Sequence, residues 1–167
     1  MPTLRYISNY PQQVKDQVLQ LVAQNNLADY LLNKYPTTHQ FSTDKSLRGY
    51  AVSIKNQYIK KSAPLSQVIY DPKIHVINNA LGLHTFVSRV QGNKLKSKNE
   101  IRVSDVFRKS PEEFLRMIVV HELAHLKEKE HNKAFYKLCI HMSSDYHQLE
   151  LDMRLYLTQL ALNGEIY

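Results

Sequence analysis

The chain has 167 residues, a net charge of +7 and 43% hydrophobic residues, values typical of a soluble protein with one sizeable core. No apolar run reaches the roughly 18 residues needed to cross a membrane, and residues 1–13 lack the apolar stretch of a signal peptide. The single cysteine, Cys139, permits no internal disulfide and fits an apolar helical pattern. We therefore expect one domain over residues 1–167, located in the cytoplasm and without a membrane partner.

The first third of the sequence predicts helices. Apolar residues recur at helical spacing over 10–34, with Pro11 at the first helical position and a break at Asn25-Asn26. Asp44 can cap the helix that follows. The apolar stripe of that helix, which we expect to face the core, comprises Leu47, Tyr50, Ala51, Ile54 and Tyr58.

After Pro64 the hydrophobic pattern changes to the period of strands. We expect four short strands, at 66–70, 74–78, 84–91 and 100–106. A turn at 71–73 joins the first two strands, and residues 92–99, which carry three lysines, join the last two. That lysine-rich segment is either a plain solvated hairpin tip or a loop that grips an anion near the active site. Together the strands predict a small antiparallel sheet.

Residues 121–125 read His-Glu-Leu-Ala-His. On a helix, His121 and His125 lie one turn apart on the same face, so both imidazoles can bind one metal ion. Zinc binds such nitrogens at about 2.0–2.1 Å and keeps a fourth position for water. Glu122 lies about 100° around the helix from His121. It is therefore placed beside the metal, where it can act as the general base toward the activated water.

The residues before this motif predict a buried helix. Ser110-Pro111-Glu112-Glu113 reads as a capping box with proline at the first helical position. The helix that follows is apolar nearly all round, which is typical of a helix inside the core. Its apolar residues are Phe114, Leu115, Met117, Ile118, Val119, Val120, Leu123, Ala124 and Leu126. Buried histidine and glutamate side chains need partners, and a metal is the simplest partner they can share.

A third ligand is needed, and His131 is the first candidate. An unbroken helix would place it about 80° off the face of His121. We therefore expect the chain to turn between Leu126 and His131, where residues 127–130 form a charged run. Asn132 then reads as the cap of a new helix. Three residues farther along are rival ligands: Glu150, His141 and His147.

Two C-terminal helices are expected, at 132–141 and 146–162, with Gly164 as a stop signal. Glu150 or Asp152 on the last helix can orient a ligand imidazole from behind. The whole pattern predicts an α+β protein. It has N-terminal helices, a small antiparallel sheet, a buried helix with the metal motif and two helices at the C-terminal end.

The sequence resembles a known family. The likeness is carried by the runs MIVVHELAHLKEKEHNKAFYKLC and YHQLELDMRLYL, and it extends to LGLHTFVSRVQGNKLKSKNEIRV and SPEEFLRMIVVHELAH. These runs resemble the YgjP-like metallopeptidase domain, a family of small bacterial proteins labelled metal-dependent hydrolases, and in particular its proteobacterial YgjP-type branch. The resemblance covers about residues 47–160. It implies a zincin-like α+β fold in which His121, His125 and His131 hold the metal and Glu122 is the base.

One segment departs from the wider family. Much of that family has Trp-Gly-Ser where this chain has Gln91-Gly92-Asn93. That segment precedes the strand beside the expected site, so the substrates of the wider family do not transfer directly. Members close to this branch are also described as nucleotide pyrophosphatases that act on UTP-like triphosphates.

We therefore weigh three functions. The first is a peptidase-like zinc hydrolase, in which an edge strand at 84–90 or 101–104 pairs with an extended peptide. The second is hydrolysis of a UTP-like nucleoside triphosphate at the same site, although the four glycines form no phosphate-binding loop. The third is a nucleic-acid-binding module with a structural metal, whose site would be closed by four ligands and would leave Glu122 without a role.

The net positive charge favours an anionic substrate such as a polyphosphate. The basic residues expected near the site are Arg89, Lys94, Lys96, Lys98 and Arg102. Nucleic acid has little further support beyond the interleaved Tyr58-Ile59-Lys60-Lys61. Zinc is the expected metal, although nickel, cobalt and manganese also suit such ligands. The sequence leaves the oligomeric state open.

Overall fold

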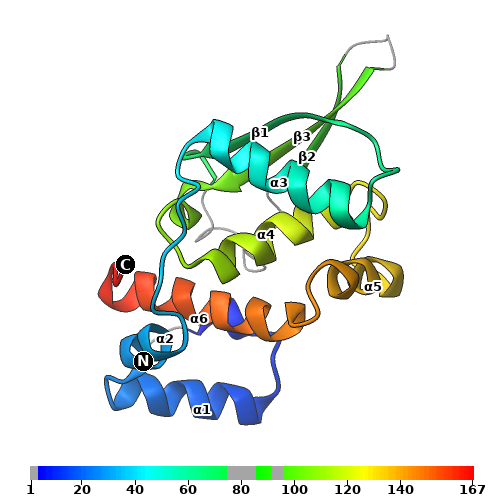
Figure 1. The fold of residues 1–167 in the computed structure, drawn as a ribbon. Coiled ribbons are helices and arrows are strands. Elements are labelled where there is room, and N and C mark those ends of the chain that lie inside the picture. The colour runs from blue at the N-terminus through cyan, green and yellow to red at the C-terminus, as the bar shows by residue number, and fades with distance from the viewer. Residues whose placement is uncertain (1–3, 75–85, 92–95) are drawn as a thin grey trace.

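The structure is a computed structural model, in which residues 4–74, 86–91 and 96–167 are described. These residues form an α+β fold built in layers (Figure 1). A small sheet packs against α3 (Asp44–Tyr58), and α4 (Glu112–Ala124) crosses the middle of the molecule. On the other side of α4 lies α6 (Tyr146–Asn163), which in turn contacts α2 (Leu27–Lys34). No helix among the described residues is long and apolar enough to cross a membrane.

The N-terminal helices confirm the predicted break. The helix α1 (Gln12–Ala23) ends just before Asn25, whose φ of 57° turns the chain into α2. The cap of α3, however, is Thr43 and not Asp44. The Thr43 side chain accepts a hydrogen bond from the Ser46 amide at 3.1 Å, because Thr43 has the extended backbone that a capping residue needs. Asp44 instead accepts from the Tyr70 amide at 2.9 Å and ties α3 to the sheet.

The sheet is mixed, so the prediction of an antiparallel sheet is wrong for one strand. Its order is β1-β3-β2, where β1 is Leu65–Asp71, β2 is Phe86–Gln91 and β3 is Lys96–Ser104. β2 and β3 pair antiparallel, as predicted, but β1 runs parallel to β3. The long segment between β1 and β3 permits the crossover connection that parallel pairing requires. β3 is the central strand, and Ile101 is paired on both sides, so Ile101 cannot form the predicted edge for a peptide. Residues 102–104 pair with β1 on one side, and on the other side the described part of β2 begins at Phe86, opposite Ile101, so an edge at 102–104 stays a prediction.

Three further strand predictions differ in their bounds or lie partly outside the described residues. Residues 96–99 belong to β3 and not to a loop, because the ladder continues from Ser88↔Asn99 to Gln91↔Lys96. The strand predicted at 74–78 starts at Ile74, which is not in a strand, and its remaining residues lie outside the described part of the chain. The predicted strand at 84–91 begins at Phe86 in the described structure.

The start of α4 differs from the predicted capping box. Ser110 is fully buried, and its hydroxyl donates to the Phe107 carbonyl oxygen at 3.1 Å. The Ser110 side chain therefore does not cap the helix. Pro111 occupies the cap position without a side-chain cap, and it forms a β-bridge with Thr38. The bridge between Pro111 and Thr38 therefore fixes the start of α4 against the loop that precedes α3.

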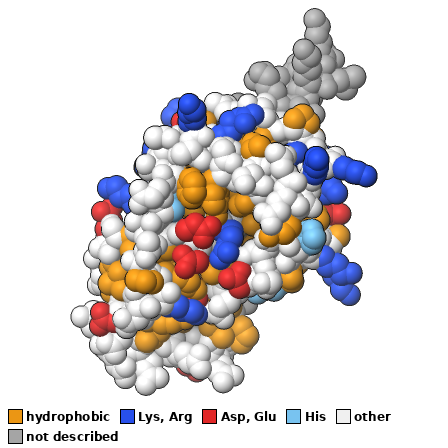
Figure 2. Space-filling view, viewed as in Figure 1, with side chains coloured by type: hydrophobic (Ala, Val, Ile, Leu, Met, Phe, Trp, Pro, Cys, Tyr) orange, Lys and Arg blue, Asp and Glu red, His pale blue; other side chains and the backbone are white. Residues whose placement is uncertain are grey.

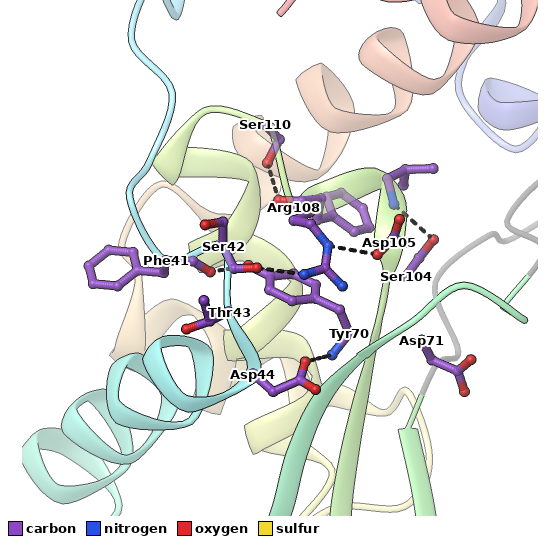
Figure 3. Close-up of polar contacts among 12 residues, drawn as sticks. Phe41, Ser42, Thr43, Asp44, Tyr70, Asp71, Ser104, Asp105, Arg108 and Ser110 are labelled. Atoms are coloured by element: carbon purple, nitrogen blue, oxygen red, sulfur yellow. Dashed lines mark hydrogen bonds and ion pairs between the residues drawn. The ribbon is translucent and has the colours of Figure 1, made fainter.

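Polar contacts of Arg108 join the segment before α4 to the loop before α3 and to strand β1 (Figure 3). Arg108 donates to the Asp105 carboxylate at 2.8 Å and to the Ser42 carbonyl at 2.6 Å. Its guanidinium also lies over the Tyr70 ring, 4.6 Å from the ring centre. One side chain thus links the loop before α3, strand β1 and the segment that leads into α4.

The core surrounds α4, which confirms the prediction of a buried helix. Every residue from Met117 to Ala124 is buried. Ile101 and Val103 of β3 are fully buried as well, and α5 (Lys133–Met142) and α6 both contact α4. The helix is therefore apolar on nearly every side because protein surrounds nearly every side.

The C-terminal helices follow the prediction closely. Asn132 caps α5 by accepting from the Phe135 amide at 2.9 Å, and Gly164 ends α6 with a φ of 88°. Asp152 of α6 is fully buried and is the anchor for α2. It accepts hydrogen bonds from Tyr30 at 3.0 Å and from Tyr35, and it pairs with Lys34 at 2.8 Å.

Candidate metal centre

Three imidazoles meet where α4 ends. The Nε2 atom of His131 lies 3.1 Å from Nε2 of His125 and 3.3 Å from Nε2 of His121. One ligand atom from each residue lies within 4.8 Å of the other two. His121 and His125 are buried and His131 is half-buried. The structure therefore brings together the three histidines that the sequence singled out.

A turn after α4 produces this arrangement. The helix ends at Ala124, and His125 is its C-cap residue. The amide of Leu126 then donates to the Leu123 carbonyl at 3.0 Å, which tightens the chain into a turn. The cap of α5 at Asn132 directs the chain back, so His131 faces the end of α4.

A buried aromatic ring on α5 supports all three imidazoles. The centre of the Phe135 ring lies 5.0 Å from that of His121, 4.6 Å from that of His125 and 4.9 Å from that of His131. Phe135 is itself fully buried. Packing against one ring restricts the rotamers of the three histidines, which prepares their common orientation.

The nitrogens on the far side of two rings are held in place. Nδ1 of His121 lies 2.8 Å from the Tyr146 hydroxyl, and Nδ1 of His125 lies 2.9 Å from the Glu128 carbonyl oxygen. A carbonyl only accepts hydrogen bonds, so Nδ1 of His125 carries the proton and its Nε2 offers a lone pair. Histidines that bind a metal typically hold their second nitrogen in this way.

The donor set fits a divalent metal. Nitrogens bound to zinc at about 2.0–2.1 Å in a tetrahedron lie roughly 3.3 Å apart, close to the separations of 3.1 and 3.3 Å between Nε2 atoms. Burial lowers the pKa of His125, while hydrogen bonds to the Glu128 and Lys129 backbone raise it. Burial is the larger cause, so the neutral imidazole is favoured, and this is the form that binds a metal.

Glu122 is fully buried one residue after His121. Packing in the core does not favour a glutamate at this position, because burying a carboxylate costs free energy unless the carboxylate has a partner or a function. Its place in the helix, about 100° around the axis from His121, is the one expected of a base beside the metal.

Comparison with known proteins agrees with this geometry. The family model described as "YgjP-like, metallopeptidase domain" matches residues 92–155. A protein of Escherichia coli (strain K12) named UTP pyrophosphatase is 60% identical over 162 residues, which are 97% of each chain. The chain belongs to the YgjP-like family. It is therefore an enzyme of the metal-dependent hydrolase class. No solved structure matches it.

The rival ligands lie apart from the YgjP-like triad. Glu150 accepts a hydrogen bond from the Tyr146 hydroxyl at 3.0 Å. The His141 ring packs edge-on against Tyr58, and the His147 ring packs against Tyr136. Among the described residues, the three-membered metal-type cluster consists of His121, His125 and His131.

The residues predicted to bind substrate are placed only in part. The side chains of Arg89, Lys94, Lys96 and Lys98 lie outside the described part of the structure. Arg102 pairs with Asp71 at 2.8 Å and with Glu100 at 2.7 Å. Its guanidinium is thus engaged by two carboxylates, and its role in binding an anion stays a prediction.

The surface charge of this YgjP-like protein does not gather into one basic patch on the face shown in Figure 2. Acidic side chains cluster near the middle of that face, around a basic one, and most of the other basic side chains lie toward its rim. The net charge of +7 therefore gives a general attraction for anions and does not mark a docking surface on this side.

Sequence reasoning missed Tyr146. We predicted that Glu150 or Asp152 can orient a ligand imidazole from behind, and the structure places the Tyr146 hydroxyl between His121 and Glu150. Burial, and then the Glu150 carboxylate, raise the pKa of Tyr146 well above its usual value. The one local signal was the spacing of Tyr146 and Glu150, four residues apart on one helix face. Asp152 instead holds α2.

Proposed function

We propose that this chain hydrolyses a nucleoside triphosphate of the UTP type at the triad of His121, His125 and His131. In this proposal the triad holds zinc, and Glu122 is the general base. The observation that carries the proposal is the convergence of three Nε2 atoms, with a buried glutamate one residue after His121 on the same helix. The choice of substrate is supported by the relative named UTP pyrophosphatase, which is alike over 97% of its length.

The ligand types favour zinc, since three neutral imidazoles suit this borderline-soft ion, although other divalent transition metals also bind such sites. When bound, the metal supplies a water of lowered pKa and a Lewis acid that polarises the bond to be cut. The chain's own contribution is orientation. The Tyr146 hydroxyl and the Glu128 carbonyl hold the rings of His121 and His125 so that both Nε2 atoms face one point.

Glu122 moves the proton. It accepts a proton from the attacking water, whose oxygen forms a bond to phosphorus as the bridging phosphorus–oxygen bond breaks. The bond that breaks joins the α-phosphorus to the bridging oxygen, so Glu122 then returns the proton to the leaving pyrophosphate. Burial among apolar residues keeps bulk water away from the Glu122 carboxylate, which strengthens its electrostatic influence at the site.

A peptide substrate is the second candidate, and it was the first hypothesis from the sequence. The family description refers to a metallopeptidase domain. Among the strands that the structure describes, in the order β1-β3-β2, strand β2 lies at an edge and overlaps the predicted edge strand at 84–90. An extended peptide can add to such an edge through backbone hydrogen bonds. The structural-metal alternative is set aside, because the family is one of hydrolases.

Glu122→Gln tests the proposal. We expect the zinc-loaded variant to keep its metal and fold but to lose at least about 100-fold in UTP hydrolysis, because proton transfer by a placed base contributes roughly 10²–10⁴-fold. Release of pyrophosphate from UTP is measured beside cleavage of an unfolded protein. Glu130→Gln is the matched control, since Glu130 is exposed on the turn and its replacement changes charge equally.

The two substrates separate the candidates. Triphosphate hydrolysis that vanishes in Glu122→Gln and persists in Glu130→Gln supports the proposal. Cleavage of the unfolded protein alone, with the same dependence on Glu122, would replace it with the peptidase function. Undiminished UTP hydrolysis in Glu122→Gln would remove Glu122 from the mechanism.

A further inference from the structure

Behind His121, a fully buried tyrosine connects the metal ligand to a second acidic residue. The Tyr146 hydroxyl lies 2.8 Å from Nδ1 of His121 and donates to Oε2 of Glu150 at 3.0 Å. The rings of Tyr146 and His121 are nearly parallel, with 17° between their planes and 6.4 Å between their centres. Three side chains from α4 and α6 therefore form one hydrogen-bonded chain.

The direction of each hydrogen bond in this chain follows from chemistry. A hydroxyl has one proton to donate, and an ionised carboxylate can only accept. The Tyr146 proton therefore points to Glu150, and the Tyr146 oxygen must accept from Nδ1 of His121. With its proton on Nδ1, His121 presents an unprotonated Nε2, and that is the atom that faces His131 at 3.3 Å.

We propose that Tyr146 and Glu150 are positioning residues that hold His121 in the Nδ1-protonated form before any metal binds. The inference rests on the proposed metal site and adds the residues that prepare it. His125 differs, because its Nδ1 proton is held by the backbone carbonyl of Glu128, which no side-chain substitution removes. Among these two ligands, His121 alone depends on replaceable side chains.

Glu150, at the far end of the hydrogen-bonded series, lines a cavity. The cavity has a volume of about 330 Å³ and is also lined by Tyr10, Tyr136, His147 and Arg154. Glu150 is half-buried there, whereas Tyr146 is fully buried. A substitution at Glu150 therefore alters the far end of the chain without opening a hole in the core. This makes Glu150 a second, milder position at which to test the same inference.

Tyr146→Phe removes the hydroxyl and keeps the ring that packs on His121. We expect its dissociation constant for zinc, measured by competition with a chelator, to rise about 10- to 100-fold, as is typical when a second partner of a metal-binding histidine is lost. Tyr156→Phe is the matched control. Tyr156 is also buried on α6, and its hydroxyl donates to the Val106 carbonyl at 3.3 Å, far from the triad.

A second readout is independent of zinc and of activity. Nitrogen-15 NMR of the metal-free protein distinguishes the two neutral forms of a histidine. We expect His121 to be Nδ1-protonated in the wild type and in Tyr156→Phe, and to populate both forms in Tyr146→Phe. In Glu150→Gln the amide can donate to Tyr146, which lets the hydroxyl proton turn toward His121, so a shift toward the Nε2-protonated form is expected.

The outcomes are distinct. Wild-type zinc affinity together with an unchanged His121 form in folded Tyr146→Phe and Glu150→Gln would overturn the inference. If Tyr146→Phe does not fold, Glu150→Gln decides by the same two measurements. If the wild type binds no zinc, the proposed metal site is wrong, and the NMR comparison still decides whether Tyr146 sets the protonation of His121.

Discussion

At the scale of single residues, the site depends on which nitrogen of each histidine faces inward. His125 directs Nε2 to the triad and fixes Nδ1 on the Glu128 carbonyl at 2.9 Å. Its side chain is 8% exposed, and Phe135 packs against its ring at 4.6 Å between centres. Such a histidine contributes a lone pair in one direction only, so its replacement removes one third of the donor set.

We therefore predict that His125→Ala purifies with little or no bound metal. A site with two imidazoles left binds zinc far more weakly than one with three, because each lost ligand must be replaced by water. Metal content per chain, measured by atomic emission, checks this. His141→Ala is the control, since the His141 ring packs on Tyr58 and lies outside the triad. An unchanged metal content in His125→Ala would refute its assignment as a ligand.

At the scale of elements, an ion pair joins strands β1 and β3 in addition to their backbone hydrogen bonds. Asp71 at the end of β1 accepts from the Lys73 amide at 2.8 Å and pairs with Arg102 of β3 at 2.8 Å. The Lys73 amide is the largest cause that holds the Asp71 pKa below its usual value of 3.8, followed by the hydrogen bond from Arg102. The parallel pairing of β1 and β3 is thus joined by a side-chain link.

This lowered pKa predicts a specific dependence of stability on pH. Because the Asp71 pKa is lower in the folded than in the unfolded chain, its contribution is present above about pH 4 and is lost as pH falls through the folded pKa. Asp71→Asn should therefore lower the melting temperature at pH 7 and flatten its fall below pH 4. Melting curves between pH 7 and pH 3 test this, with the exposed Asp29→Asn as control. Parallel curves for Asp71→Asn and the wild type would contradict it.

Features that depend on neighbouring residues could be predicted from the sequence alone. Helical periodicity and the break at Asn25 are local signals, and the structure confirms both. The convergence of His121, His125 and His131 was equally predictable, because the histidines and the turn that joins them lie within one short stretch. Capping was less predictable: Thr43 and Asp44 are both good caps, and only the sheet beside them decides which one is used.

Contacts between distant parts of the chain could not be predicted. The parallel pairing of β1 with β3 depends on how the segment between them returns, and the strand pattern is the same for either direction. The Tyr146 contact with His121 joins residues 25 apart through the packing of α6 on α4. Periodicity showed that both helices face the core, but it does not show which side chains meet there.

At the scale of the whole molecule, metal binding and folding should be coupled. The triad spans the end of α4 and the start of α5, so a bound ion joins two helices that are also held by packing. We predict that zinc raises the melting temperature of the metal-free protein. Free zinc at 100 times its dissociation constant contributes about 2.7 kcal/mol, or roughly 5–10 °C for a chain of this size.

Calorimetric scans with and without zinc measure this shift. His121→Ala is the control, and it should show a much smaller response because the ligand set is incomplete. An equal rise in the wild type and in His121→Ala would mean that zinc acts elsewhere on the chain. Removal of zinc with a chelator should return the wild type to the lower melting temperature.

The anchoring of α2 through Asp152 has a practical consequence for recombinant design. The segment 92–155 contains the triad, Glu122, Tyr146 and Glu150. A chain trimmed to that segment would, however, remove Tyr30, Lys34 and Tyr35 from the fully buried Asp152. A buried carboxylate that loses its partners costs roughly 3–5 kcal/mol, which is a large part of a typical folding stability. The shortest useful expression fragment therefore includes α2, even though α2 contributes no side chain to the proposed site.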